Sequence, residues 1–330
     1  TKRSVQRDPL DFGSRYELFL LTRDFSILND LTTIMHGSLH NYIDLSISYS
    51  EANLYTDASN VLALVAEEDK SMLHYYMAYY SSSKMELAVA EKSRHDCEFP
   101  NRLQSIMVFN YAIENNPGDW FPHYALGNLY YDKGVWERSV ELWEACADKI
   151  ELPTVYRNLS LAYYNKLHDA DRAREAMEKA FKMDRTDARV FFELDQLYRT
   201  LNLTLNERFA AMEENSGILE SRDDLYTEYI TLLNLRHEYD NAYERIMSHN
   251  FHPWEGGEGK IPAQYRKALI NKAKAEPEKA IECLEQALSY PHNLGEGKLI
   301  GNLDNDINYM LGGLYTEPEK KEWAYRMAAR

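Results

Sequence analysis

Apolar residues recur along this chain at spacings of three and four, whereas alternation of apolar and polar residues is scarce. Such spacing places apolar side chains on one face of an α-helix, so the pattern predicts an all-α protein. In the clearest example Leu126–Tyr130 lies in one predicted helix and Lys133-Gly134 forms a turn. A second helix follows, and its predicted inner face carries Ser139, Trp143 and Cys146.

The same pair of helices is repeated along the chain. Leu126, Leu159 and Leu194 hold equivalent positions, at steps of 33 residues (126 to 159) and 35 residues (159 to 194). These steps are typical of a helix-turn-helix repeat. Other residues that keep the phase are Ser160, Tyr163, Ala173, Met177, Ala180 and Tyr198.

Weaker copies of the pair extend the array in both directions. Pairs or single helices are predicted at residues 41–66, 72–80, 103–115, 225–247 and 264–290. Leu311-Gly312 and Tyr315 open a last repeat that the chain does not finish. We therefore divide the chain into an N-terminal helical cap or linker, residues 1–40, and a repeat array, residues 41–330, whose last repeat is truncated.

The repeat resembles the tetratricopeptide repeat, whose signature places Leu-Gly, tyrosine, alanine and an aromatic residue at fixed offsets. Glycine or serine lets the two helices approach closely, and tyrosine fills the space between neighbouring repeats. Three positions depart from the signature: His123 replaces tryptophan, Ser139 replaces alanine and Arg185 replaces proline. The spacing is kept, so the resemblance implies a right-handed α-solenoid of tetratricopeptide type.

In the frame of this repeat, the first helix of each pair lines a concave groove. The predicted groove residues are Tyr124, Asn128, Tyr131, Arg157, Asn158, Tyr164, Gln196 and Arg199. Some tetratricopeptide proteins hold a partner's terminal carboxylate in a clamp, whose offsets fall here on Tyr124, Asn128, Asn158, Arg189 and Glu193. Two asparagines match, but Tyr124 lacks a charge and Glu193 has the wrong sign. These differences argue against a clamp and leave other peptide binding open.

The tetrapeptide Gly-Glu-Gly-Lys occurs twice, at Gly257–Lys260 and Gly295–Lys298, 38 residues apart. Stacked repeats would bring Glu258 and Glu296 to one edge. Capping of helix ends is the preferred interpretation; binding of a ligand such as a sugar, and acid–base catalysis, are the alternatives. We assign no catalytic residue. The candidate ligand-binding residues are His252, Trp254, Glu255, Glu258, Lys260, His292, Glu296 and Lys298.

Charged residues interrupt helical segments that the pattern would bury. Glu193 and Asp195 lie in one such segment, and Arg222–Asp224 in another. Because a buried charge must be paired, they predict an Arg/Asp network between adjacent repeats. The 25 tyrosines are expected to fill spaces between repeats, each hydroxyl reaching the rim or a polar partner.

Composition limits the classes of partner. The 330 residues carry a formal charge of −16, which argues against nucleic acid and anionic membranes as partners. No apolar run approaches the roughly 20 residues of a membrane span. Cys146 and Cys283 lie on apolar faces and are expected to be buried, which favours a reducing, cytoplasmic setting. The histidine and cysteine spacings predict no metal site, and we expect no cofactor. Both chain ends look cut, which suggests a fragment.

Several segments are together similar to the tetratricopeptide region of large, uncharacterised bacterial proteins that begin with a galactose-mutarotase-like β domain. They are Cys97–Leu103, Tyr124–Asp132, Arg157–Leu159, Phe192–Leu197, Arg222–Leu225, His252–Lys260 and Leu294–Lys298. The resemblance implies that this chain is the C-terminal helical part, with a carbohydrate connection through the β domain. It implies no reaction.

These observations predict a non-catalytic scaffold that binds a partner protein, a peptide or an upstream β-rich domain of the same polypeptide. The alternative is a carbohydrate-binding or carbohydrate-processing module, with Trp254 as the sugar platform and Glu255, Glu258 and Glu296 as its polar groups. The two hypotheses make different predictions for Glu258 and Glu296. In a scaffold both carboxylates should bond to helix ends, whereas in a sugar site both should face an open cleft lined by aromatic residues.

Overall fold

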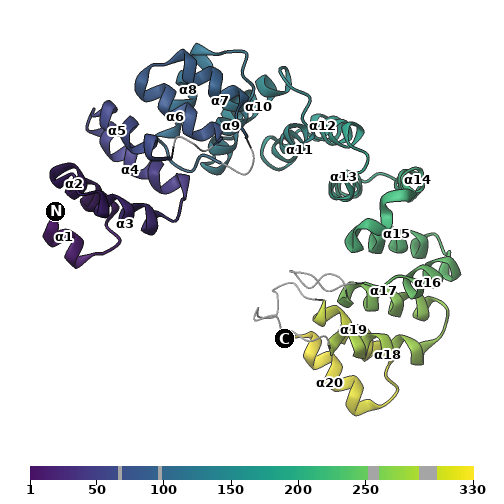
Figure 1. Ribbon diagram of the computed structural model, residues 1–330. Helices are drawn as coiled ribbons and strands as arrows, with labels where there is room; N and C mark the ends of the chain where they lie inside the picture. Colours follow the sequence, from purple (N-terminus) through teal and green to yellow (C-terminus); the bar gives the residue numbers. More distant parts are fainter. Residues whose placement is uncertain (66–68, 96–98, 252–259, 290–302) are drawn as a thin grey trace. The chain divides into compact units, whose positions relative to one another are not determined.

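The computed structural model describes residues 1–65, 69–95, 99–251, 260–289 and 303–330, without the side chains of 260–262 (Figure 1). Within these residues every regular element is a helix, and an isolated bridge joins Lys70 to Arg94. The all-α prediction is therefore confirmed. The chain divides into two compact units, Thr1–Asp169 and Ala170–Arg330, which are described separately.

The first unit is a succession of helical hairpins. Contacts join α2 to α3, α4 to α5, α6 to α7 and α9 to α10, while α8 packs on both α6 and α9. Its elements are α1 (Lys2–Arg7), α2 (Phe12–Thr22), α3 (Phe25–Met35), α4 (Leu39–Glu51), α5 (Tyr55–Leu62), η1 (Ala63–Val65), α6 (Ser71–Ser81), α7 (Lys84–Lys92), α8 (Ser105–Asn115), α9 (Phe121–Asp132), α10 (Trp136–Ala147), α11 (Pro153–Ala162) and the π-helical η2 (Tyr163–Leu167).

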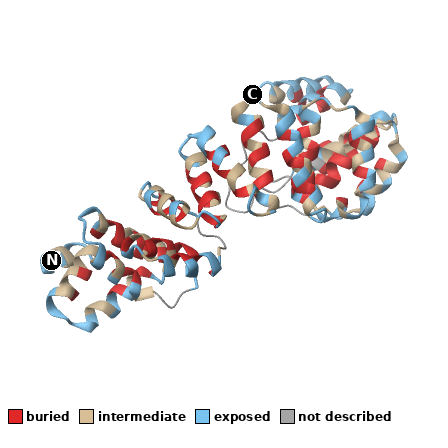
Figure 2. Ribbon diagram, turned by 90° about the horizontal axis from the view of Figure 1, so that it is seen from above, coloured by how far each residue is buried: buried red, intermediate tan, exposed pale blue. Residues whose placement is uncertain are grey.

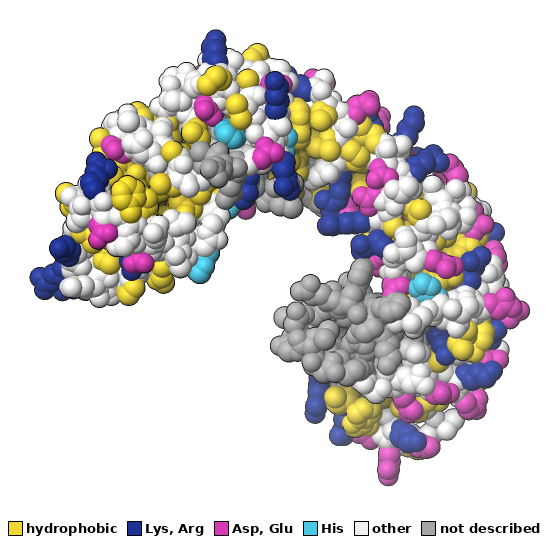
Figure 3. All heavy atoms as spheres, in the orientation of Figure 1, with side chains coloured by type: hydrophobic (Ala, Val, Ile, Leu, Met, Phe, Trp, Pro, Cys, Tyr) yellow, Lys and Arg dark blue, Asp and Glu magenta, His cyan; other side chains and the backbone are white. Residues whose placement is uncertain are grey.

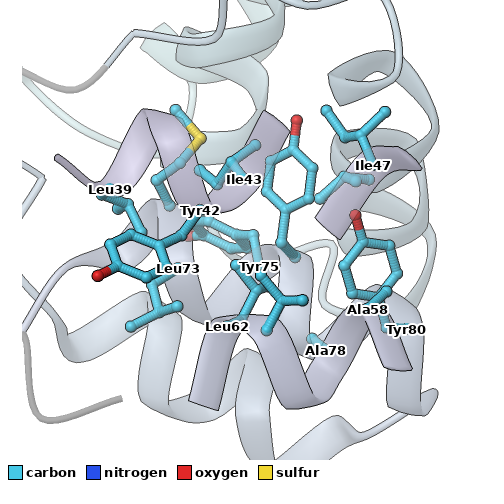
Figure 4. Packing of buried hydrophobic residues seen from close by; sticks show 14 of the residues in the cluster. Leu39, Tyr42, Ile43, Ile47, Ala58, Leu62, Leu73, Tyr75, Ala78 and Tyr80 are labelled. Atoms are coloured by element: carbon cyan, nitrogen blue, oxygen red, sulfur yellow. The ribbon is translucent and has the colours of Figure 1, made fainter. Parts of the chain in front are cut away.

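One core runs through this unit, because each hairpin buries an apolar face against the next (Figure 2). Leu39 and Ile43 on α4 lie beside Leu62 on α5 and Leu73 on α6 (Figure 4). The core also contains Tyr16 and other residues of α2 and α3, so residues 1–40 pack on the same core as the hairpin that follows them. Their assignment as a separate cap stays a prediction.

Three buried tyrosines of the first unit bond polar groups outside their own helices, in agreement with the prediction. Tyr75 donates to Asp119 Oδ2 at 2.6 Å, and the hydroxyls of Tyr76 and Ser105 are 2.7 Å apart. The Tyr49 hydroxyl donates to Glu17 at 2.5 Å. These bonds satisfy hydroxyl groups that would otherwise be costly to bury.

The second unit repeats the scheme. Hairpin contacts join α15 to α16, α17 to α18 and α19 to α20. The first helix of each repeat also packs on the first helix of the next, so that α13 contacts α15 and α15 contacts α17. Its elements are α12 (Ala170–Met183), α13 (Ala188–Thr200), α14 (Leu205–Glu214), the 3₁₀ turn η3 (Ser216–Ser221), α15 (Asp223–Leu235), α16 (Tyr239–Ser248), α17 (Lys260–Ala273), α18 (Pro277–Leu288), α19 (Asp304–Leu314) and α20 (Pro318–Ala328).

Two details of the predicted array differ in the structure. The last repeat, predicted to be truncated, contains a second helix, since α20 follows α19 and packs on it. The two helices predicted to form the repeat around Leu159 and Ala173 are divided between the two compact units. The first unit ends with α11 and η2, and the second begins with α12.

The surface mixes acidic and basic side chains over both units (Figure 3). Among the described helices, none is both long and apolar enough to cross a membrane. The described His, Cys, Asp and Glu side chains form no group of three or more with the arrangement of a metal site.

Candidate functional site

The eight candidate residues of the two Gly-Glu-Gly-Lys segments lie outside the part of the chain that the structure describes. For Lys260 this applies to the side chain, since its backbone begins α17. Ligand binding by His252, Trp254, Glu255, Glu258, Lys260, His292, Glu296 and Lys298 therefore stays a prediction.

The predicted groove residues of the first unit lie on one half-buried stretch of α9, α11 and η2. Asn128 is its centre: its Oδ1 accepts from Trp143 Nε1 at 3.1 Å and from Asn158 Nδ2 at 3.4 Å. The Tyr131 ring packs on the Trp143 ring, with centroids 5.4 Å apart. The structure thus brings Asn128 and Asn158 together, but their amides hold helices to one another.

The remaining members of this set are Tyr124 on α9, Arg157 on α11 and Tyr164 in η2, all half-buried. Tyr124 packs beside Trp120, with ring centroids 6.1 Å apart. Partner binding by Tyr124, Asn128, Tyr131, Arg157, Asn158 and Tyr164 stays a prediction.

Gln196 and Arg199, the predicted groove residues of the second unit, lie one helical turn apart on α13. Gln196 Oε1 accepts a hydrogen bond from the Arg199 guanidinium. Arg199 also extends to α15, where its Nη1 is 3.6 Å from Glu228 Oε1. The Arg199 side chain is 54% exposed, whereas that of Glu228 is 8% exposed. An accessible cation is therefore held by a buried carboxylate.

Glu228 belongs to a buried ion network that joins three helices. Arg208 of α14 donates from Nε and Nη2 to the two carboxylate oxygens of Asp195 on α13, at 2.9 and 2.6 Å. The same Nη2 donates to Glu228 Oε1 on α15 at 2.8 Å. Burial by itself lowers the pKa of Arg208, but the two carboxylates raise it above its ordinary value. Arg208 is thus charged and fixes α13, α14 and α15 to one another.

The predicted Arg/Asp network is therefore present around Asp195. In the second predicted segment, residues 222–224, Arg222 pairs within the segment itself. Arg222 donates to Asp224 Oδ2 at 2.6 Å, and Asp223 pairs with His249 at 2.8 Å. Glu193 pairs with Arg189 one turn away, at 3.3 Å. Two of the positions considered for a carboxylate clamp thus bind each other.

Arg266 of α17 also contacts α15, the helix that carries Glu228. Arg266 is half-buried, and its Nε donates to Thr231 Oγ1 of α15 at 2.5 Å. Burial lowers the pKa of Arg266, while the neighbouring charge of Glu228 raises it and that of Arg199 lowers it further. We call Asp195, Arg199, Arg208, Glu228 and Arg266 the arginine cluster.

Sequence reasoning found Asp195 and Arg199 but missed Arg208, Glu228 and Arg266. One signal was available for Arg208: it stands four residues before Met212, and the two are the buried residues of α14. An arginine in the apolar row of a short helix indicates a buried ion pair. Glu228 and Arg266 show no such pattern, because their neighbours lie on other repeats.

One segment of this chain matches a model of a known family. Residues 261–291 match the model of the tetratricopeptide repeat. These residues cover most of α17 and all of α18, the helical pair that presents Arg266.

Solved tetratricopeptide repeat structures are similar over larger parts of the chain. YrrB, described as a tetratricopeptide protein with an unusual peptide-binding site, is 16% identical over 67% of this chain and 86% of its own, with a TM-score of 0.32. A tetratricopeptide repeat protein of Parabacteroides merdae is 12% identical over 88% and 99%, with a TM-score of 0.36.

A component of the Cut9–Hcn1 assembly of the APC/C is 10% identical over 86% of this chain and 50% of its own, with a TM-score of 0.39. The hairpin of α17 and α18 thus matches the tetratricopeptide repeat.

Proposed function

We propose that this chain is a non-catalytic scaffold that binds a partner protein on the face of α13, α15 and α17. The observation that carries the proposal is that Arg199 of α13 and Arg266 of α17 both reach side chains of α15, the helix that contacts α13 and α17. Stacked first helices form the extended surfaces on which repeat proteins bind their partners.

The buried ions beneath this face suit it to binding. Arg208 joins Asp195 to Glu228, and Glu228 in turn holds Arg199. The exposed groups are therefore fixed before a partner arrives, which reduces the conformational entropy lost on binding. The described carboxylates of this network are engaged by arginine, so we assign them no acid–base role.

A bacterial, carbohydrate-related setting remains the finer part of the proposal. It rests on the resemblance stated above and on the two Gly-Glu-Gly-Lys segments. Replacing Glu258 and Glu296 by glutamine tests it: if ligand binding is unchanged and the melting temperature falls, the segments are structural and the sugar-binding alternative fails.

The scaffold function itself is tested by a peptide-display selection and a glycan array on the intact chain. Selected peptides should lose affinity for the Gln196→Ala/Arg199→Ala variant. They should keep it for Arg185→Ala, which removes an arginine that is 58% exposed and paired with Glu214. Peptides that bind both variants equally would place the binding surface elsewhere.

A further inference from the structure

The Arg266 guanidinium occupies a half-buried position with a neutral hydrogen-bond partner. Its Nε donates to Thr231 Oγ1, and the Thr231 hydroxyl itself donates to the backbone carbonyl of Thr227 at 2.8 Å. Among the described residues, none places a carboxylate within ion-pair distance of Arg266. The remaining N–H groups of its guanidinium fork are therefore not matched by a carboxylate of the described chain.

Such an arrangement is costly for the chain alone. Partial burial removes water from a charged group, and a neutral hydroxyl returns little of the lost solvation. Arg208 shows the opposite case in the same unit, since two carboxylates surround it. The difference indicates that Arg266 is arranged for an anion that the described chain does not supply.

The arginine cluster has an excess of positive charge. Arg199, Arg208 and Arg266 supply three guanidinium groups, against the two carboxylates of Asp195 and Glu228. This excess stands out because the whole chain has a formal charge of −16. A locally cationic face on an acidic protein selects an acidic partner by charge complementarity.

We propose that Arg266, together with Arg199, binds aspartate or glutamate side chains in an acidic segment of a partner protein. The inference rests on the proposed scaffold function and names the chemistry of its partner. The planar guanidinium of Arg266 would hold one carboxylate through two N–H groups. Arg199, which pairs with Glu228, would attract a second acidic side chain of the same segment.

Glu228 lowers the positive charge that the arginine cluster presents to an anion. Its carboxylate lies 3.6 Å from Arg199 Nη1, and its charge acts to raise the pKa of Arg266. Any bound anion is therefore repelled by Glu228. Binding requires that the attraction of Arg266 and Arg199 for the anion exceed this repulsion.

The test uses a fluorescein-labelled peptide in which glutamate and serine alternate, with an acetylated N-terminus and an amidated C-terminus. The control peptide has glutamine in place of glutamate. Fluorescence polarisation on the full chain should show binding of the glutamate peptide only, and its affinity should fall as salt is added. A third peptide, with glutamine side chains and a free C-terminal carboxylate, separates terminal from side-chain recognition.

The variants are Arg266→Met and, as a control, Arg326→Met, which removes an arginine that is 75% exposed and paired with Glu322 on α20. We expect Arg266→Met to weaken binding of the glutamate peptide by about tenfold or more, the usual effect of losing a charged hydrogen bond. Arg326→Met should bind as the parent does.

Thermal unfolding separates a binding role from a structural one. If Arg266 binds an external carboxylate, Arg266→Met should melt at or above the temperature of the parent, because an unpaired, partly buried charge is removed. The glutamate peptide should raise the melting temperature of the parent and not that of the variant. A variant that melts lower and still binds the peptide overturns the proposal.

Other results also overturn it. They are failure of the parent to bind the glutamate peptide, equal binding of the glutamine peptide, and binding that requires the free C-terminal carboxylate. The scaffold function survives these results if display selection still yields peptides that depend on Gln196 and Arg199. It fails separately if the selected peptides ignore both residues.

Discussion

The indole of Trp143 lies directly over Gly127, where the Cβ of any other residue would have to be. A Cβ built on Gly127 would stand 2.6 Å from both Cδ1 and Nε1 of the ring. The ring is buried and its Nε1 donates to Asn128, so it is fixed from two sides. Absence of a side chain at Gly127 therefore sets the close approach of α9 and α10.

Replacing Gly127 with alanine should destabilise the protein. Overpacking a core costs about 1–3 kcal/mol, and alanine regains about 1 kcal/mol of helix propensity, so we expect a net loss of up to about 2 kcal/mol. Urea unfolding followed by circular dichroism measures the loss. In a Trp143→Leu background the same substitution should become neutral or stabilising, because the obstructing ring is gone.

Gly118→Ala is the matched control for that experiment. A Cβ at Gly118 would have no neighbour within 4 Å, so alanine should leave the free energy of unfolding unchanged or slightly raised. Equal effects at Gly118 and Gly127 would contradict the argument from the Trp143 contact.

Arg208→Ala should be among the most damaging single substitutions in the second unit. It leaves the carboxylates of Asp195 and Glu228 buried without their shared cation, and breaking such a pair costs about 3–5 kcal/mol. Arg138→Ala removes an exposed pair with Glu141 and should cost less than about 1 kcal/mol. Urea unfolding of both variants gives the comparison.

A double variant checks the cause of that loss. Arg208→Met leaves the same two charges unpaired, and adding Asp195→Asn neutralises one of them. The double variant should therefore be more stable than Arg208→Met alone. If the second substitution lowers stability further, the loss arises from packing and not from charge.

The repeat period was readable from the sequence because buried leucines and small residues recur with it. The predicted helices around Leu45 and Ala58, and around Ala242 and Ala280, are present as the hairpins α4/α5, α15/α16 and α17/α18. The extent of the second helix of the last repeat was not predicted. In α20 Ala324 is the buried residue, and Glu and Lys occupy much of the rest, so the apolar row is too thin to detect.

The candidate site was only partly predictable, for a different physical reason. The period shows which residues share a helix face, so it located Gln196 and Arg199. It does not show which charges of separate repeats meet, and the contact of Arg208 with Glu228 depends on how α14 packs on α15. Side chains that act across repeats, such as Arg266 and Thr231, therefore needed the structure.

The buried Asp119 should give the stability of the protein a measurable pH dependence. Its side chain accepts from Tyr75 and from the backbone N–H of Phe121 at 3.1 Å, and burial still raises its pKa above the ordinary 3.8. Between 3.8 and the raised value, the folded chain binds more protons than the unfolded chain. This contribution to stability is thus present at low pH and lost as the pH rises.

Asp119→Asn isolates the effect, because asparagine keeps the shape and does not titrate. The free energy of unfolding of the parent, minus that of the variant, should fall as the pH rises through the folded pKa of Asp119. Urea titrations from neutral pH to the lowest pH at which both proteins fold give this difference. A difference that rises with pH would show that hydrogen bonding outweighs burial.

The two described cysteines should be chemically silent in the folded protein. Both are buried; burial raises the pKa of Cys146 to about 12 and also raises that of Cys283. Attack on a disulfide reagent requires the thiolate, which is scarce at pH 8 for such groups. In a Cys97→Ser variant, which removes the cysteine outside the described residues, DTNB should therefore react only as fast as the protein unfolds. Urea should release two reactive thiols together with the loss of helical circular dichroism, whereas a rapid reaction in native buffer would show that one of these helix faces opens to solvent.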